Sequence, residues 1–165
     1  MGNLFLSPYG RIGSAAFYRC GYILILISIA LSLINLLSPQ IGKMLGIISY
    51  ALIYPWVVIW IKRLHNGGKS GWMFLVYLII YFVVAMVGFG MALSMFGGDV
   101  FMQMLTDQVE GRITQAEMQT QLEIWARENM APMLIASIGV SVLTMFIGDK
   151  TIPTDADDNQ YGPVP

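Results

Sequence analysis

The chain has 165 residues, of which 56% are hydrophobic and only 12% are charged, and its formal net charge is −1. Soluble domains carry about 25% charged residues, so this composition excludes an ordinary water-facing surface and indicates a protein that lies in lipid. The nine Lys and Arg residues are spread along the chain and form no basic stripe, so we expect no nucleic-acid partner.

Four stretches are apolar and uncharged over the roughly 20 residues that a helix needs to cross a bilayer. They are residues 20–37, 44–61, 72–96 and 130–147. Backbone groups in hydrocarbon must be hydrogen-bonded within their own segment, so each stretch should be helical despite its Ile and Val content. The predicted fold class is therefore all-α, a four-span transmembrane helix bundle in which Pro55 kinks the second helix.

The connection at residues 97–129 is long enough to hold structure of its own. Thr114 and Glu117 fit a capping box. Three apolar residues follow at helical spacing: Met118, Leu122 and Trp125. We expect a short amphipathic helix at residues 115–129, lying on the membrane surface or on the bundle. A solvated helix with a few apolar contacts is the equally open alternative.

Basic residues near the span ends predict the orientation, because cytoplasmic loops carry an excess of Lys and Arg. Six of the nine lie on the side of the two termini: Arg11, Arg19, Lys62, Arg63, Lys69 and Lys150. The other three lie on the opposite side, where the loop at 97–129 is acidic: Lys43, Arg112 and Arg127. Both termini are therefore predicted to be cytoplasmic. Three indole side chains are expected at the inner interface: Trp56, Trp60 and Trp72.

The domain organisation is a four-helix membrane domain at residues 1–148, followed by a polar tail at residues 149–165. The tail cannot build a core by itself, and disorder is its default expectation. An alternative is that the last residues pack on the bundle. In that case three tail carboxylates would attract Arg11, Lys62 and Arg63: those of Asp155, Asp157 and Asp158. Arg11 and Tyr161 are the candidate residues of this cytoplasmic face.

No catalytic constellation is visible in the sequence, and we expect no enzyme activity. His65 is the only histidine and Cys20 the only cysteine, so we expect no metal site and no cofactor, and Cys20 should be an inert apolar side chain. The predicted spans contain no ionisable residue of the kind that marks ion pathways and proton relays. This argues against a proton-coupled transporter or an intramembrane protease.

The basic loop at residues 62–72 is the candidate site for an anion or a lipid headgroup. Its candidate residues combine positive charge, an imidazole and turn-forming glycines: Lys62, Arg63, His65, Gly67, Gly68, Lys69, Ser70 and Trp72. Successive N–H groups in glycine turns can form an anion-binding nest, and the third span begins just after the loop. The alternative is that the basic residues only anchor the spans and the glycines only turn the chain.

Three stretches resemble the family known as domain of unknown function 805, which are small bacterial inner-membrane proteins. Residues 9–14, Tyr-Gly-Arg-Ile-Gly-Ser, resemble its Gly-Arg-Ile-Ser opening. Residues 62–72, Lys-Arg-Leu-His-Asn-Gly-Gly-Lys-Ser-Gly-Trp, resemble its central Arg-Arg-Leu-His-Asp-x-Gly-Lys-Ser-Gly-Trp stretch. Residues 159–165, Asn-Gln-Tyr-Gly-Pro-Val-Pro, resemble its Asn-Arg-Tyr-Gly-Pro close. One departure is Asn66, where the family usually has an acidic residue.

The resemblance implies residence in the bacterial cytoplasmic membrane and supplies no activity. Our leading interpretation is a non-enzymatic membrane protein that binds membrane lipids, including anionic headgroups, or a protein partner, which could be a second copy of the chain. A small transporter or channel subunit is the alternative, and an intramembrane enzyme comes third. A polar cavity lined by several spans would favour transport, whereas apolar packing would favour the leading interpretation.

Overall fold

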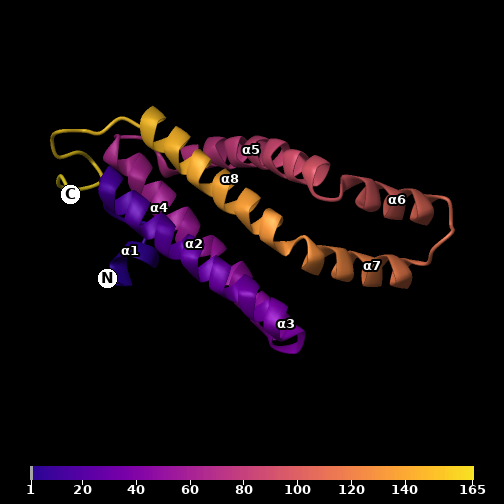
Figure 1. Ribbon diagram of the computed structural model, residues 1–165. Helices are drawn as coiled ribbons and strands as arrows, with labels where there is room; N and C mark the ends of the chain where they lie inside the picture. The colour runs from indigo at the N-terminus through magenta and orange to yellow at the C-terminus, as the bar shows by residue number, and fades with distance from the viewer. Residues whose placement is uncertain (1) are drawn as a thin grey trace. The chain divides into compact units, whose positions relative to one another are not determined.

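The structure is a computed structural model that describes residues 2–165, apart from the side chains of Asn3, Leu36, Pro39, Lys43 and Ile47 (Figure 1). Over this range the chain is helical, and its β-structure is one isolated bridge between Asn159 and Gly162. The all-α prediction is confirmed. The chain forms two compact units. The first holds the residues up to Tyr81 together with Ser141–Pro165, and the second is Phe82–Val140.

The helices lie in chain order from α1 to α8. Their bounds are α1 Gly2–Phe5, α2 Ser14–Leu37, α3 Pro39–Ala51, α4 Ile53–Asn66, the 3₁₀ turn η1 Gly71–Met73, α5 Phe74–Met95, α6 Gly98–Val109, α7 Gln115–Glu128 and α8 Met130–Thr151. Four segments are long and apolar enough to cross a membrane: Ser14–Asn35, Gln40–Asn66, Gly71–Met95 and Met130–Thr151. The four predicted spans are thus confirmed, and most of them continue past the apolar stretch into charged residues.

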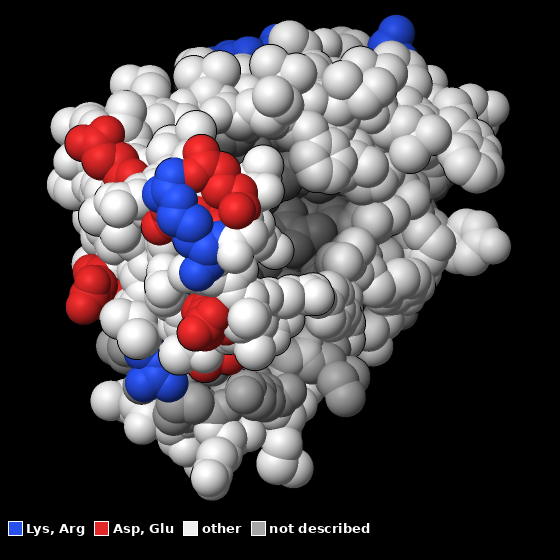
Figure 2. All heavy atoms as spheres, turned by 90° about the vertical axis from the view of Figure 1, so that its right-hand side faces the viewer, with Lys and Arg blue, Asp and Glu red and all other residues white. Residues whose placement is uncertain are grey.

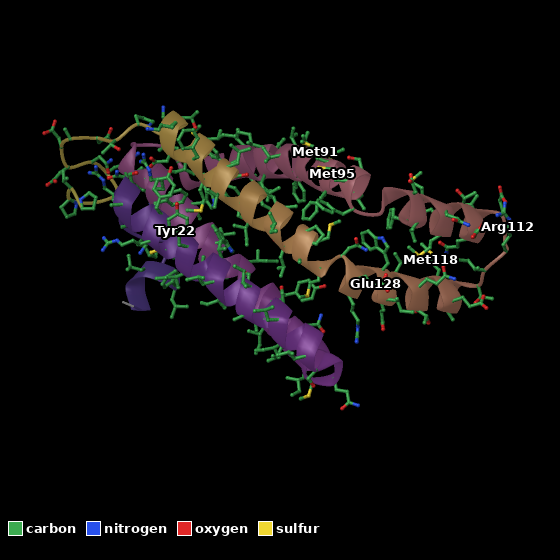
Figure 3. All side chains as sticks on the ribbon, viewed as in Figure 1. Tyr22, Met91, Met95, Arg112, Met118 and Glu128 are labelled. Carbon is green, nitrogen blue, oxygen red and sulfur yellow. The ribbon has the colours of Figure 1, made fainter. Side chains whose placement is uncertain are left out.

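Apolar side chains cover much of the outside of these spans. Tyr22 on α2 is 46% exposed, and Met91 and Met95 on α5 are 60% and 70% exposed (Figure 3). A soluble protein rarely leaves so continuous an apolar surface in water. The exposed faces therefore suit contact with lipid.

The second span is broken into α3 and α4, as the sequence predicts from its proline. α3 ends at Ala51, and α4 starts at Ile53. Pro55 has no N–H group to donate to the carbonyl of Ala51, four residues earlier, so the helical hydrogen-bond ladder is interrupted here. The hairpin between α2 and α3 is tight: a Cβ added at Gly42 would lie 2.0 Å from the Asn35 side-chain oxygen.

The core of the first unit gathers around Trp60, which the sequence places at the membrane interface. In the structure its side chain is buried, with 6% exposed. Its ring meets Phe17 edge to face at 5.0 Å and stacks on Tyr77 at 5.0 Å. Gly148 on α8 leaves room for the indole, since a Cβ there would lie 2.3 Å from it. Trp72, by contrast, is 81% exposed.

The second unit contains a helical hairpin of α6 and α7, of which only α7 was predicted. The capping box at Thr114 and Glu117 is present. Met118 is buried on the face of α7 turned toward α6 (Figure 3), and the Trp125 ring lies 5.4 Å from that of Phe101. The apolar face of α7 therefore packs against α6.

Charged side chains gather at the end of the second unit where α6 and α7 meet (Figure 2). At the turn between these helices, Arg112 forms ion pairs with Asp107 and Glu110. Arg112 and Glu110 are exposed and Asp107 is partly exposed, so the pairs contribute little to stability. The hairpin is held by its apolar interior.

Candidate functional site

Arg63, in the last turn of α4, is 2% exposed, and its guanidinium group is bound entirely within the protein. Nε donates to the Asp149 carboxylate at 2.9 Å. The other nitrogens donate to the carbonyl oxygens of Asp149, Ile152 and Pro153 at 3.2, 2.9 and 3.1 Å. The second Asp149 oxygen accepts from Ser14 Oγ at 2.8 Å. Arg63 therefore joins α4 to the end of α8, and its fork is not available to an outside anion.

Arg11, from the segment before α2, is also buried and binds the C-terminal tail. Nε and Nη2 donate to Asn66 Oδ1 at 3.3 and 3.2 Å. Nη1 donates to the carbonyl oxygens of Asp157 and Gly162 at 2.9 and 3.1 Å, and Nη2 to that of Asp155 at 3.0 Å. The expected attraction to tail carboxylates is wrong in this detail, because the acceptors in the tail are backbone oxygens. A planar guanidinium with five N–H donors suits such a set.

The C-terminal tail lies near the end of α4 (Figure 1), and Tyr161 contacts that helix. Its ring stacks on His65 with a centroid distance of 3.8 Å and an interplanar angle of 3°. His65 Nδ1 lies 3.2 Å from the Gly10 carbonyl oxygen, and Asn159 Nδ2 donates to the His65 carbonyl at 3.0 Å. The prediction that the last residues pack on the bundle is confirmed, and the expectation of disorder is wrong. The tail needs no core of its own because it uses partners at the helix end.

The glycine turn ends α4 rather than forming the expected anion nest. The N–H groups of Gly67 and Lys69 both donate to the Leu64 carbonyl at 3.0 Å, and that of Gly68 donates to His65 at 3.1 Å. Gly68 has φ +66°. This is the Schellman arrangement, which satisfies the free carbonyls of a helix end. These three N–H groups are consequently not free to bind an anion.

We call Arg11, Arg63, His65, Asn66 and Asp149, together with residues 152–162, the polar cap. It divides the candidate residues of the basic loop into two classes. The buried or packed class comprises Lys62, Arg63, His65 and Gly67. The exposed class comprises Gly68, Lys69, Ser70 and Trp72. The exposed class is the part of the loop that a ligand can reach, whereas the buried arginines hold the helices together.

A cavity of about 220 Å³ lies between α4, α5 and α8 within the first unit. Five of its eleven lining residues are aromatic: Trp56, Trp60, Phe74, Tyr77 and Tyr81. α8 contributes Ser141, Thr144 and Met145. This cavity was not predicted from the sequence. The available signal was a pair of aromatic residues four positions apart on each of two spans, Trp56 with Trp60 and Tyr77 with Tyr81, because that spacing places both rings on one helix face.

Among residues 2–165 no group of three or more His, Cys, Asp or Glu side chains is placed to hold a metal ion. The family model described as a protein of unknown function, DUF805, matches residues 5–163. The chain belongs to this family. No curated protein and no solved structure gives a significant match. The DUF805 match includes the basic loop and both residues of the predicted cytoplasmic face, Arg11 and Tyr161.

Asn66, the residue that departs from the stretch the sequence resembles, is buried inside the polar cap. The residue is fully buried, and its Oδ1 accepts from Arg11. Its Nδ2 has no hydrogen-bond partner among the described residues. A carboxylate would offer Arg11 two acceptor oxygens and leave no donor unsatisfied. The chain therefore carries a local defect in its polar cap that an aspartate would remove.

Proposed function

We propose that this DUF805 protein is a non-enzymatic lipid-binding protein of the bacterial inner membrane, with both termini in the cytoplasm. The observation that carries the proposal is the cavity between α4, α5 and α8. Its walls are mainly aromatic and apolar, and it lies among three of the four candidate membrane spans. In hydrocarbon such a cavity suits one acyl chain, whose apolar surface matches the wall.

The competing transporter or channel subunit would need a polar route through the spans. Across the four spans as the structure describes them, Asp149 is the one acidic residue, and it is bound to Arg63 at the end of α8. Carboxylates that relay protons lie in the membrane interior and face a water-filled cavity. The aromatic wall of the cavity favours lipid over such a route.

Filling the cavity tests this function. Ser141→Phe adds a ring on the cavity side of α8, and it should lower the fraction of protein that retains a lipid in native mass spectrometry. Leu143→Phe is the matched control, since Leu143 is 48% exposed and does not line the cavity. Both variants must remain helical and monodisperse in detergent. If folded Ser141→Phe retains lipid as the parent protein does, the lipid-binding function is refuted.

The orientation is tested with single cysteines in a Cys20→Ser background. Ser70, Gln108 and Gln160 are exposed and suit labelling, whereas Asn66 is fully buried and would be a poor probe. An impermeant thiol reagent added to intact spheroplasts should label position 108 alone. Labelling at 70 or 160 before lysis would reverse the proposed topology.

A further inference from the structure

We propose that the bound lipid is anionic, with its phosphate at the exposed turn of Lys69 and Ser70 beside Trp72 and one acyl chain in the aromatic cavity. The inference rests on the proposed lipid-binding function and names the ligand class and the residues that select it. The recognising chemistry is an ammonium group for charge, a hydroxyl for a phosphate oxygen, and an indole ring at the level of the headgroup.

The structure leaves Lys69 as the cation of the basic loop that reaches the outside. Arg63 is held by Asp149 and three carbonyl oxygens, and Arg11 is held by Asn66 and the tail. Lys62 is 5% exposed. The backbone of Lys69 is fixed by its hydrogen bond to the Leu64 carbonyl at 3.0 Å, so its side chain leaves from a defined position.

The turn leads directly into the wall of the cavity. η1 covers Gly71–Met73, and α5 starts at Phe74, which is the first residue of α5 on the cavity wall. A 3₁₀ helix rises about 2 Å per residue, so Phe74 lies about 6 Å along the axis from Gly71. Leu78 and Tyr81 continue the wall along α5. A lipid that lies along this helix would therefore meet the turn with its headgroup and the rings with its chain.

The other exposed lysine near this end, Lys150, does not meet the cavity. α8 advances about 100° per residue, so Lys150 points about 140° away from Met145 on the cavity wall. Its ammonium group lies 5.7 Å from the Phe146 ring centroid instead. The two exposed lysines therefore form a matched pair of equal charge: Lys69 directly precedes the turn that leads to the cavity wall on α5, and Lys150 lies on another face of α8.

The expected selectivity is modest. One lysine close to a bilayer surface strengthens binding of an anionic headgroup by about fivefold. The carboxylate of Asp155 opposes this, because it lies beside Gly68, where an added Cβ would be 2.8 Å from Asp155 Oδ2. We therefore expect the full-length protein to prefer an anionic lipid over a neutral one with the same chains by up to about fivefold.

The test uses the full chain in bilayer discs that contain phosphatidylglycerol and phosphatidylethanolamine with identical acyl chains, and native mass spectrometry counts the two retained lipids. Lys69→Gln should reduce the preference for phosphatidylglycerol to about one. Lys150→Gln should keep the preference. Excess inorganic phosphate should displace neither lipid, because the chain contributes to binding.

The outcomes separate the two proposals. If Lys69→Gln retains the preference, or if Lys150→Gln abolishes it equally, the anionic site at the turn is refuted while lipid binding itself stands. If inorganic phosphate displaces phosphatidylglycerol, the turn binds free anions and the inference is overturned. If Ser141→Phe retains both lipids unchanged, the cavity holds no acyl chain. That result refutes the proposed lipid-binding function itself, and with it the anionic site.

Discussion

Replacing Asp149 with Asn should destabilise the protein strongly, because it removes the charge that faces Arg63 in a buried pair. Arg63 and Asp149 have 2% and 11% of their side chains exposed. Removing one partner from a buried ion pair costs about 3–5 kcal/mol. Arg63 keeps three carbonyl acceptors, and Asn can still accept from Ser14. We therefore expect the free energy of unfolding to fall by the lower end of this range, about 3 kcal/mol. This loss changes the unfolding equilibrium constant by more than about a hundredfold.

The measurement is SDS-induced unfolding in mixed micelles, followed by far-UV circular dichroism. Asp157→Asn is the matched control, because the Asp157 side chain is exposed and the polar cap uses its carbonyl oxygen. The control should stay within about 0.5 kcal/mol of the parent protein. Equal losses in the two variants would contradict the assignment of Asp149 as the charge partner of Arg63.

Three further predictions concern other parts of the chain. Hydrogen bonds from the Thr114 backbone and hydroxyl lower the pKa of Glu117 below its ordinary value. The capping box therefore stabilises α7 above about pH 4.5 and loses this effect as the pH falls. Amide hydrogen exchange in the first turn of α7 should become faster on acidification, and an exchange rate that does not change with pH in this way would contradict the prediction. Asn66→Asp should raise the free energy of unfolding by about 1–2 kcal/mol by pairing with Arg11 and removing the unsatisfied donor, and a loss of stability in the SDS titration would refute this. Tyr161→Ala should weaken the packing of the tail on α4 by about 1 kcal/mol and speed amide exchange in the tail, whereas Tyr161→Phe should do neither. Equal amide exchange in the two variants would show that the ring stack does not hold the tail.

The features that the sequence predicts correctly are local ones. Span positions follow from hydropathy over about 20 residues, and the break before α4 follows from the missing N–H group of Pro55. The capping box depends on two residues, Thr114 and Glu117, three positions apart. Each of these needs only neighbouring residues, so a single chain suffices to predict it. Charged residues ended the predicted spans early, although the helices continue through Arg63 and Lys150.

The features that escaped prediction depend on partners far along the chain. Arg63 carries a charge and was expected to be accessible, but its burial depends on Asp149, 86 residues later. No local pattern indicates that carbonyl oxygens will replace water around it. α6 was not predicted because the glycine pair Gly97 and Gly98 at its start is typical of a loop. The apolar face of α6 is recognisable only once α7 lies against it. The cavity likewise requires the relative placement of three spans.

The long reach of Arg11 has a consequence for how the protein is made. Its tail acceptors, the carbonyl oxygens of Asp155, Asp157 and Gly162, lie 144, 146 and 151 residues further along the chain. During synthesis the first spans therefore enter the membrane well before these oxygens exist, and Arg11 must remain hydrated at the membrane surface until translation ends. Completion of the polar cap is thus a late event in biogenesis. A chain cut short by a dozen residues would carry every span and still expose an unfinished helix end to quality-control proteases.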